Sequence, residues 1–198
     1  MARLTGALAL VAALGLPATE SARAADLPMP APLPTFALID ATPRFELRGG
    51  LAASTWGPET GEVNFNAEFD SPRLYTFQGW ERFFIPRVQV GGTANLQGGT
   101  SYFYGGPMWT VDYGRYFADF SVGGAVHDGQ SANINPKRNV LGGCRVLYHT
   151  GADVGYQFDE HWSGMITFDH ISNGSGTLSS CGKNEGATIL GVRIGYRF

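Results

Sequence analysis

The chain has 198 residues and a formal net charge of −3, a length that suits one domain. Charged residues make up only 16% of it, whereas aromatic residues make up 13% and glycine occupies 28 positions, which excludes a disordered tail or a coiled coil. No basic run is present, so a nucleic-acid partner is not expected. The sequence also lacks the run of roughly 18 apolar residues that a membrane-spanning helix needs, but an alternating β-barrel could still cross a membrane.

The first 24 residues have the features of a secretory signal peptide. Arg3 supplies the positive charge, residues 4–16 are uncharged and mostly apolar, and Ala22 and Ala24 are the small residues expected before a cleavage site. The apolar run is too short to anchor the chain in a membrane. We therefore expect residues 1–24 to be removed on export from the cytoplasm.

Residues 25–43 form a proline-rich leader ahead of the fold. Alternate prolines suit an extended polyproline segment and exclude a central strand; they are Pro28, Pro30, Pro32 and Pro34.

From residue 44 to the end of the chain, apolar and polar residues alternate with period two, and turn residues interrupt the pattern. We predict eight strands, at about 44–55, 61–69, 84–97, 100–113, 115–128, 142–158, 161–172 and 187–198. Residues 70–83 could form either a long turn or an additional strand. The prediction is an all-β fold, an eight-stranded antiparallel barrel over residues 44–198.

The faces of these strands indicate which side of the barrel meets lipid. In the last strand, Leu190, Val192 and Ile194 alternate with Arg193 and Arg197. Two arginines on one face cannot lie in a dry core without partners, but they suit a polar barrel interior. The same alternation places further charged residues inside, namely Arg115, Asp119, His127, Arg145, His149 and Asp153. A transmembrane barrel is therefore favoured over a soluble sandwich or lipocalin, whose apolar face would point inward.

Two cysteines are expected at the outer end of this barrel. An even number of strands places both chain ends on the periplasmic side, so residues 170–186 and Cys144 lie at the extracellular end. Cys144 and Cys181 lack the spacing of a zinc or thioredoxin-like site, and lone cysteines in an oxidising compartment more often pair. We predict a disulfide between them, worth roughly 4 kcal/mol in the chain-entropy model.

The end of the seventh strand carries the candidate chemistry. His170 and Ser172 are two residues apart, so they share a face with Trp162, Ile166 and Phe168. A histidine beside a hydroxyl provides a general base and a nucleophile, and the adjacent Asn173 with its flanking N–H groups could stabilise an oxyanion. The pattern indicates acyl-ester hydrolysis on a lipid reached from the bilayer. The alternative is that both polar residues mark the water interface.

Several short segments occur in a particular order along the chain: GGAVHDG at 123–129, GCR at 143–145, HISNG at 170–174, Asn184-Glu185-Gly186 and the ending GVRIGYRF at 191–198. Taken together, they resemble the PagL family of lipid A 3-O-deacylases, in particular its alphaproteobacterial branch. The similarity covers most of residues 44–198.

The resemblance implies roles for individual residues. His170 would be the base, Ser172 the nucleophile and Asn173 an oxyanion-site residue. Family members orient the histidine with a glutamate, and the corresponding position here is Thr188. A hydroxyl cannot stabilise an imidazolium as a carboxylate does, so we expect a weak or inactive enzyme unless Glu185 folds back to supply the acid.

The function expected from the sequence is hydrolysis of the 3-position acyl ester of lipid A in the bacterial outer membrane, without cofactor or metal. The expected partners are lipopolysaccharide in the outer leaflet and the barrel-assembly machinery, the latter through the terminal aromatic residue Phe198; a homodimer is left open. The alternative is a non-enzymatic small barrel, structural or lipid-binding, on the same scaffold. A diffusion porin is disfavoured because eight strands leave no open channel.

Overall fold

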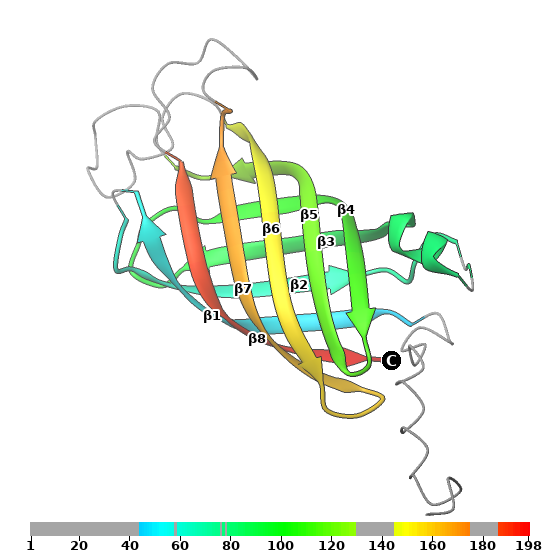
Figure 1. Cartoon of the computed structure of the whole chain (residues 1–198). Coiled ribbons are helices and arrows are strands. Elements are labelled where there is room, and N and C mark those ends of the chain that lie inside the picture. Colours follow the sequence, from blue (N-terminus) through cyan, green and yellow to red (C-terminus); the bar gives the residue numbers. More distant parts are fainter. Residues whose placement is uncertain (1–43, 58, 76, 78, 130–144, 175–185) are drawn as a thin grey trace, which may run out of the picture. The chain divides into compact units, whose positions relative to one another are not determined.

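The computed structural model describes residues 44–57, 59–75, 77, 79–129, 145–174 and 186–198. Within them, eight strands form a closed barrel in which each strand pairs with its sequence neighbours and β1 pairs with β8, all antiparallel (Figure 1). The strands are β1 (Glu46–Trp56), β2 (Val63–Asp70), β3 (Arg87–Asn95), β4 (Tyr102–Tyr113), β5 (Tyr116–His127), β6 (Val146–Gln157), β7 (Trp162–Ser172) and β8 (Ala187–Arg197). The predicted fold class is confirmed.

The two ends of the barrel differ in their connections. At the end that we call the turn end, β1 begins, β8 ends, and short turns join β4 to β5 and β6 to β7. The opposite end, the loop end, carries the connections that follow β1, β3, β5 and β7. The expected signal peptide (1–24), the leader (25–43) and both cysteines lie outside the described residues.

The segment between β2 and β3, which the sequence left open as a turn or a strand, contains a short 3-10 helix, η1 (Trp80–Phe84). The Trp109 indole N–H donates to the carbonyl oxygen of Phe84, 3.2 Å away, and ties the segment to β4. In the part of the chain that the structure describes, no helix has the length and apolar character needed to cross a membrane.

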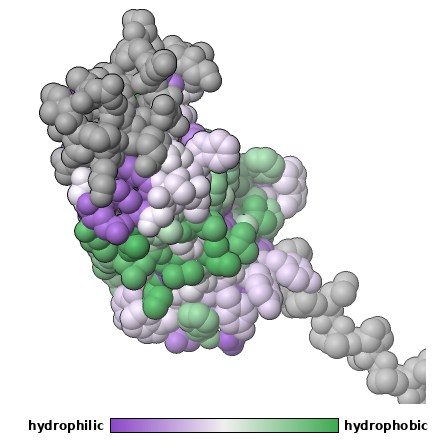
Figure 2. All heavy atoms as spheres, turned by 90° about the vertical axis from the view of Figure 1, so that its left-hand side faces the viewer, coloured by the Kyte–Doolittle hydropathy of each residue, from purple (hydrophilic) through white to green (hydrophobic). Residues whose placement is uncertain are grey.

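The outward face of the wall is apolar. Large hydrophobic residues are exposed on every strand; examples are Leu51, Phe65, Val90, Phe103, Phe120, Val154, Ile166 and Val192. Figure 2 shows hydrophobic side chains gathered in a band across one face of the barrel, with more polar residues on either side. This arrangement is that of a barrel wall in contact with lipid.

The inward face is polar and buried, as the alternation predicts. Arg193, Arg197, Asp119, His149 and Asp153 all lie inside with at most 6% of their surface exposed. Arg115 and Arg145 were expected inside as well, and this expectation is wrong, since both are exposed. Each precedes its strand by one residue, so the alternation of the sheet no longer dictates its direction.

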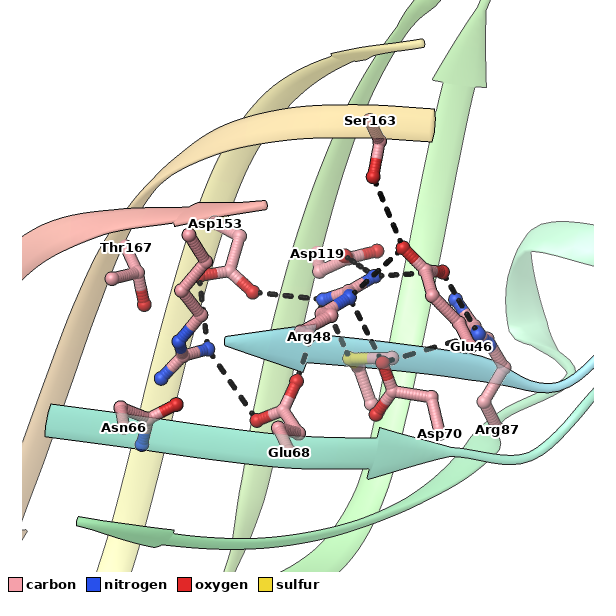
Figure 3. Close-up of polar contacts among 12 residues, drawn as sticks. Glu46, Arg48, Asn66, Glu68, Asp70, Arg87, Asp119, Asp153, Ser163 and Thr167 are labelled. Atoms are coloured by element: carbon pink, nitrogen blue, oxygen red, sulfur yellow. Dashed lines mark hydrogen bonds and ion pairs between the residues drawn. The ribbon is translucent and has the colours of Figure 1, made fainter. Parts of the chain in front are cut away.

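Arg48 occupies the centre of an ionic network in the half of the lumen nearer the turn end (Figure 3). Its guanidinium nitrogens lie 3.1, 2.9, 2.8 and 3.0 Å from carboxylate oxygens of Glu46, Asp70, Asp119 and Asp153. Because a buried charge is tolerated only when it is paired, these carboxylates and Arg48 depend on one another.

A second cluster lies nearer the loop end. Arg193 pairs with Asp169, and the imidazole Nε2 of His149 lies 3.1 Å from the same carboxylate. The His149 ring also stacks on Tyr104, with ring centroids 4.1 Å apart. Charged side chains therefore pair across the lumen and fill it, as expected of a small barrel without an open channel.

Candidate active site

The two candidate catalytic side chains lie at the loop end of β7 on the outward face. His170 and Ser172 are partly exposed, whereas Asp169 and Ile171 between and beside them are buried in the lumen. The parity of the strand fixes this arrangement, because successive side chains point to opposite faces. The sequence prediction that His170 and Ser172 share the apolar face of Trp162, Ile166 and Phe168 agrees with the structure.

Thr188 contacts the histidine directly. The register of β7 and β8 places His170 opposite Thr188, and the Nδ1 atom of the imidazole lies 2.8 Å from the threonine hydroxyl oxygen. If Nδ1 carries the ring proton and donates it to Thr188 Oγ1, the lone pair of Nε2 is free to accept a proton from a nucleophile. The contact can therefore hold the tautomer that general-base catalysis needs.

The neighbours of His170 and Ser172 on β6 are also uncharged. Thr150 lies opposite His170, and Tyr148, which is 43% exposed, lies opposite Ser172. Among the described residues that the register places beside His170 on the outward face, none is acidic. The residue proposed as an alternative acid, Glu185, lies outside the described residues.

Gly186 closes the site from the loop that precedes β8. Its φ is +65°, a conformation that residues with a side chain rarely adopt. A Cβ atom at this position would lie 3.0 Å from the carbonyl oxygen of Ile171, 3.4 Å from His170 Cε1 and 3.5 Å from Ser172 Cβ. Glycine is therefore favoured by the backbone conformation and by the close approach to the Ile171 carbonyl oxygen, while a side chain here would be in van der Waals contact with the two candidate catalytic residues.

Asn173 and the two cysteines were also singled out from the sequence. Asn173 follows Ser172 directly after the end of β7 and is only 5% exposed. Cys144 and Cys181 lie outside the described residues, and their disulfide stays a prediction.

Sequence reasoning did not single out the interior cluster around Asp169 or the packing role of Gly186. Asp169 lies next to His170 in the sequence, but its contacts with Arg193 on β8 and His149 on β6 join different strands of the barrel. A local sequence pattern does not predict contacts between such distant residues.

Comparison with known proteins identifies the family of the chain. Residues 59–197 match the family model described as lipid A 3-O-deacylase (PagL). Among solved structures, the outer membrane enzyme PagL has a TM-score of 0.58 at 11% identity, with 76% of this chain and 97% of that chain covered. The N-terminal β-barrel domain of Pseudomonas aeruginosa OprF has a TM-score of 0.51 at 10% identity, with 78% and 97% covered.

At such identities the structural matches establish the fold alone, and no curated protein sequence matches the chain. The family model, in contrast, covers well over half of the chain. The chain therefore belongs to the PagL family of lipid A 3-O-deacylases, and it has the fold of an outer-membrane β-barrel.

Proposed function

We propose that this protein removes the 3-position acyl chain of lipid A, with Ser172 as nucleophile and His170 as general base on the lipid-facing wall. The observation that carries this proposal is the contact between His170 Nδ1 and Thr188 Oγ1 at 2.8 Å, on the same face as Ser172. A histidine oriented by a neighbouring group and placed two residues from a serine is the minimum machinery for acyl transfer.

The proposed orientation puts the loop end outside the cell. His170 and Ser172 then lie at the outer-leaflet edge of the apolar band, level with the glucosamines and the first carbons of the acyl chains. The substrate would approach sideways within the leaflet, because the lumen is filled by ionic side chains. Export of the chain relies on the signal peptide at residues 1–24.

The reaction follows from the two side chains. Ser172 Oγ attacks the ester carbonyl carbon while its proton passes to Nε2 of His170, and Asn173 with its neighbouring N–H groups supports the oxyanion. The intermediate collapses with cleavage of the bond to the sugar oxygen, which takes the proton from His170. Water then attacks the acyl-serine with His170 again as base, which releases the fatty acid and restores the hydroxyl. No cofactor or metal takes part.

Thr188 makes the proposed enzyme a slow one. A threonine hydroxyl can hold the tautomer of His170, but it contributes no charge to offset the imidazolium that forms during attack. A loop conformation that brings the Glu185 carboxylate to the ring would supply that charge. Among the described residues beside His170 on the outward face, none is acidic. This observation also favours the alternative function, a structural or lipid-binding barrel without activity.

The aromatic cluster at the turn end supports a role for the last residue in assembly. Phe198 is 58% exposed, and its ring lies 6.3 Å from that of Phe45 and 6.4 Å from that of Phe69, centroid to centroid. We propose that this terminal aromatic is read by the barrel-assembly machinery. The proposed function and assembly do not require the protein to form a homodimer.

Mass spectrometry of lipid A tests the function. A Gram-negative strain that expresses the wild-type chain should lose one hydroxy fatty acid from its lipid A, whereas a strain expressing Ser172→Ala should not. Ser163, which is buried in the lumen, provides the matched control, because Ser163→Ala should leave the mass change in place. Both variants should keep the heat-modifiable gel mobility of a folded barrel. Unchanged lipid A with folded wild-type protein would contradict the enzymatic proposal and leave the non-enzymatic barrel.

A further inference from the structure

The end of β1, beside the candidate active site, carries an irregularity that points to a binding subsite. Along β1, Ala53 pairs with Leu190 and Ser54 with Ile189, but Trp56 and not Thr55 pairs with Thr188. Relative to β8, Thr55 is therefore an extra residue in β1, and such an extra residue defines a β-bulge. Bulges of this kind occur at barrel rims and re-aim the side chain that follows them.

The bulge determines where Trp56 points. Ser54 is buried in the lumen, so a regular strand would turn Thr55 outward and Trp56 inward. With the extra residue, both Thr55 and Trp56 are on the outside, and Trp56 is 72% exposed, the highest value among the large hydrophobic residues described. The outward indole is thus a product of the bulge and not of the strand alternation.

Main-chain and side-chain hydrogen bonds hold the bulge in place on both sides. Towards β2, the Ser54 N–H donates to the Glu62 carbonyl oxygen and the Gly61 N–H donates to the Ser54 carbonyl oxygen, each at 2.8 Å. Towards β8, the Thr55 hydroxyl donates to the carbonyl oxygen of Thr188 at 3.3 Å. The position of Trp56 is therefore linked to the residue that orients His170.

The register places Trp56 in one row with the candidate catalytic residues. Across the outward face, Trp56 lies opposite Thr188, and Thr188 lies opposite His170. Two interstrand steps of about 4.8 Å separate the backbone of Trp56 from that of His170, roughly 10 Å in all. Figure 1 shows β1 and β8 side by side at this end of the barrel.

We infer that Trp56 walls a binding subsite for the sugar portion of an acylated glycolipid, a proposal that rests on the function proposed above. Once the 3-position ester reaches Ser172, the sugar to which it is attached lies at the level of this row. The face of an indole packs against the C–H groups of a pyranose ring, while the hydroxyl groups of the sugar remain free for water. The competing explanation for an exposed tryptophan at this depth is an interfacial membrane anchor.

Binding without turnover provides the first test. Ser172→Ala protein in detergent micelles is titrated with lipid A, and its tryptophan fluorescence is compared with that of the Ser172→Ala, Trp56→Phe double variant. We expect a saturable change that the double variant loses and that a diacyl phospholipid without a sugar does not produce. An identical change in the double variant, or an equal response to the phospholipid, would overturn the subsite.

Kinetics provides the second test. Trp56→Ala should raise KM, expressed as the mole fraction of lipid A in the micelles, by about tenfold and change kcat by no more than about twofold. Phe103, which is 61% exposed at the loop end of β4 and lies away from β7 and β8, is the matched control, and Phe103→Ala should leave KM unchanged. A membrane anchor would instead lower the folded fraction in both variants. If the wild type shows no turnover, the proposed function fails, whereas the titration still decides the subsite.

Discussion

Asp169 and His170 are consecutive residues of β7, yet they lie in opposite environments. Asp169 points into the lumen, where Arg193 forms an ion pair with it and the Nε2 atom of His149 lies 3.1 Å from its carboxylate. His170 points toward lipid, where its partner is the uncharged hydroxyl of Thr188. The wall of the barrel therefore separates an inner face stabilised by ion pairs from an outer face that carries a neutral candidate active site.

The inner carboxylate depends on its partners because it is buried, whereas the outer site lies near the membrane interface, where an ionised side chain costs at most about 1 kcal/mol. A carboxylate opposite His170 would therefore be tolerated there, and the threonine found at this position holds the ring without supplying charge. If the inner face serves folding and the outer face serves chemistry, substitutions on the two faces should have separable effects.

The largest effect is expected on the inner face. Arg48→Met would leave the carboxylates of Glu46, Asp70 and Asp119 without their common partner, and the loss of one member of a buried ionic cluster costs about 3–5 kcal/mol. Urea unfolding in detergent measures the change in the free energy of unfolding. Arg44→Met, which removes only a surface pair with Glu160, should have little effect. Equal stability of the Arg48→Met protein and the wild type would refute the division of roles.

The next effect concerns the outer face and the orientation of His170. Thr188→Ala should lower kcat by roughly 10- to 100-fold, as the loss of a hydrogen-bond partner does for a histidine that binds a metal, and leave the free energy of unfolding nearly unchanged. Thr188→Glu should raise activity, because it places a carboxylate where the imidazolium forms.

Glu185→Gln is the counterpart of this experiment. If Glu185 supplies the missing charge, Glu185→Gln should cost on the order of 10⁴-fold in turnover, and Thr188→Ala almost nothing. That pattern of rates would show that the hydroxyl contact does not orient the ring.

A smaller effect is expected where the outer loop meets the site. Gly186→Ala places a side chain at φ +65° and against the carbonyl oxygen of Ile171, at a cost of about 1 kcal/mol in stability. Because the shift that relieves the contact with Ile171 also moves the backbone beside His170 and Ser172, activity should fall as well. Gly98, which has φ +84° and open space around it, gives the control, and Gly98→Ala should lower stability without affecting activity. A fully active Gly186→Ala protein would mean that the loop does not contribute to the site.

The smallest effect is expected for the turn between β6 and β7, which is part of neither the inner nor the outer face of the barrel wall. The backbone N–H groups of Trp162 and His161 donate to Asp159 and hold the pKa of its carboxyl below the ordinary value of 3.8. A lowered folded-state pKa stabilises the fold above the unfolded-state pKa, and this contribution is lost as the pH falls through the folded-state value. The stability difference between wild type and Asp159→Asn should therefore be present at neutral pH and vanish in acid, which unfolding curves at both pH values measure. A difference that persists in acid would exclude this cause.

The sequence by itself determined the strand positions to within a few residues and the direction of the key side chains. Period-two alternation is local, so it placed His170 and Ser172 on the apolar face and Arg193 inside without any knowledge of the fold. It failed at Arg115 and Arg145, which lie beyond the strand ends, and it did not resolve η1, because neither position is governed by an alternating pattern.

Only the tertiary structure decided which residues meet. The register of β7 against β8 brought Thr188 to His170, and closure of β1 onto β8 brought Trp56 into the same row. The lumen brought Arg48 to five carboxylates. These contacts join strands that are far apart in the chain, and they depend on hydrogen-bond ladders, one bulge and barrel closure. Local periodicity specifies the face on which a side chain lies but not the residue across from it, and the latter defines the site.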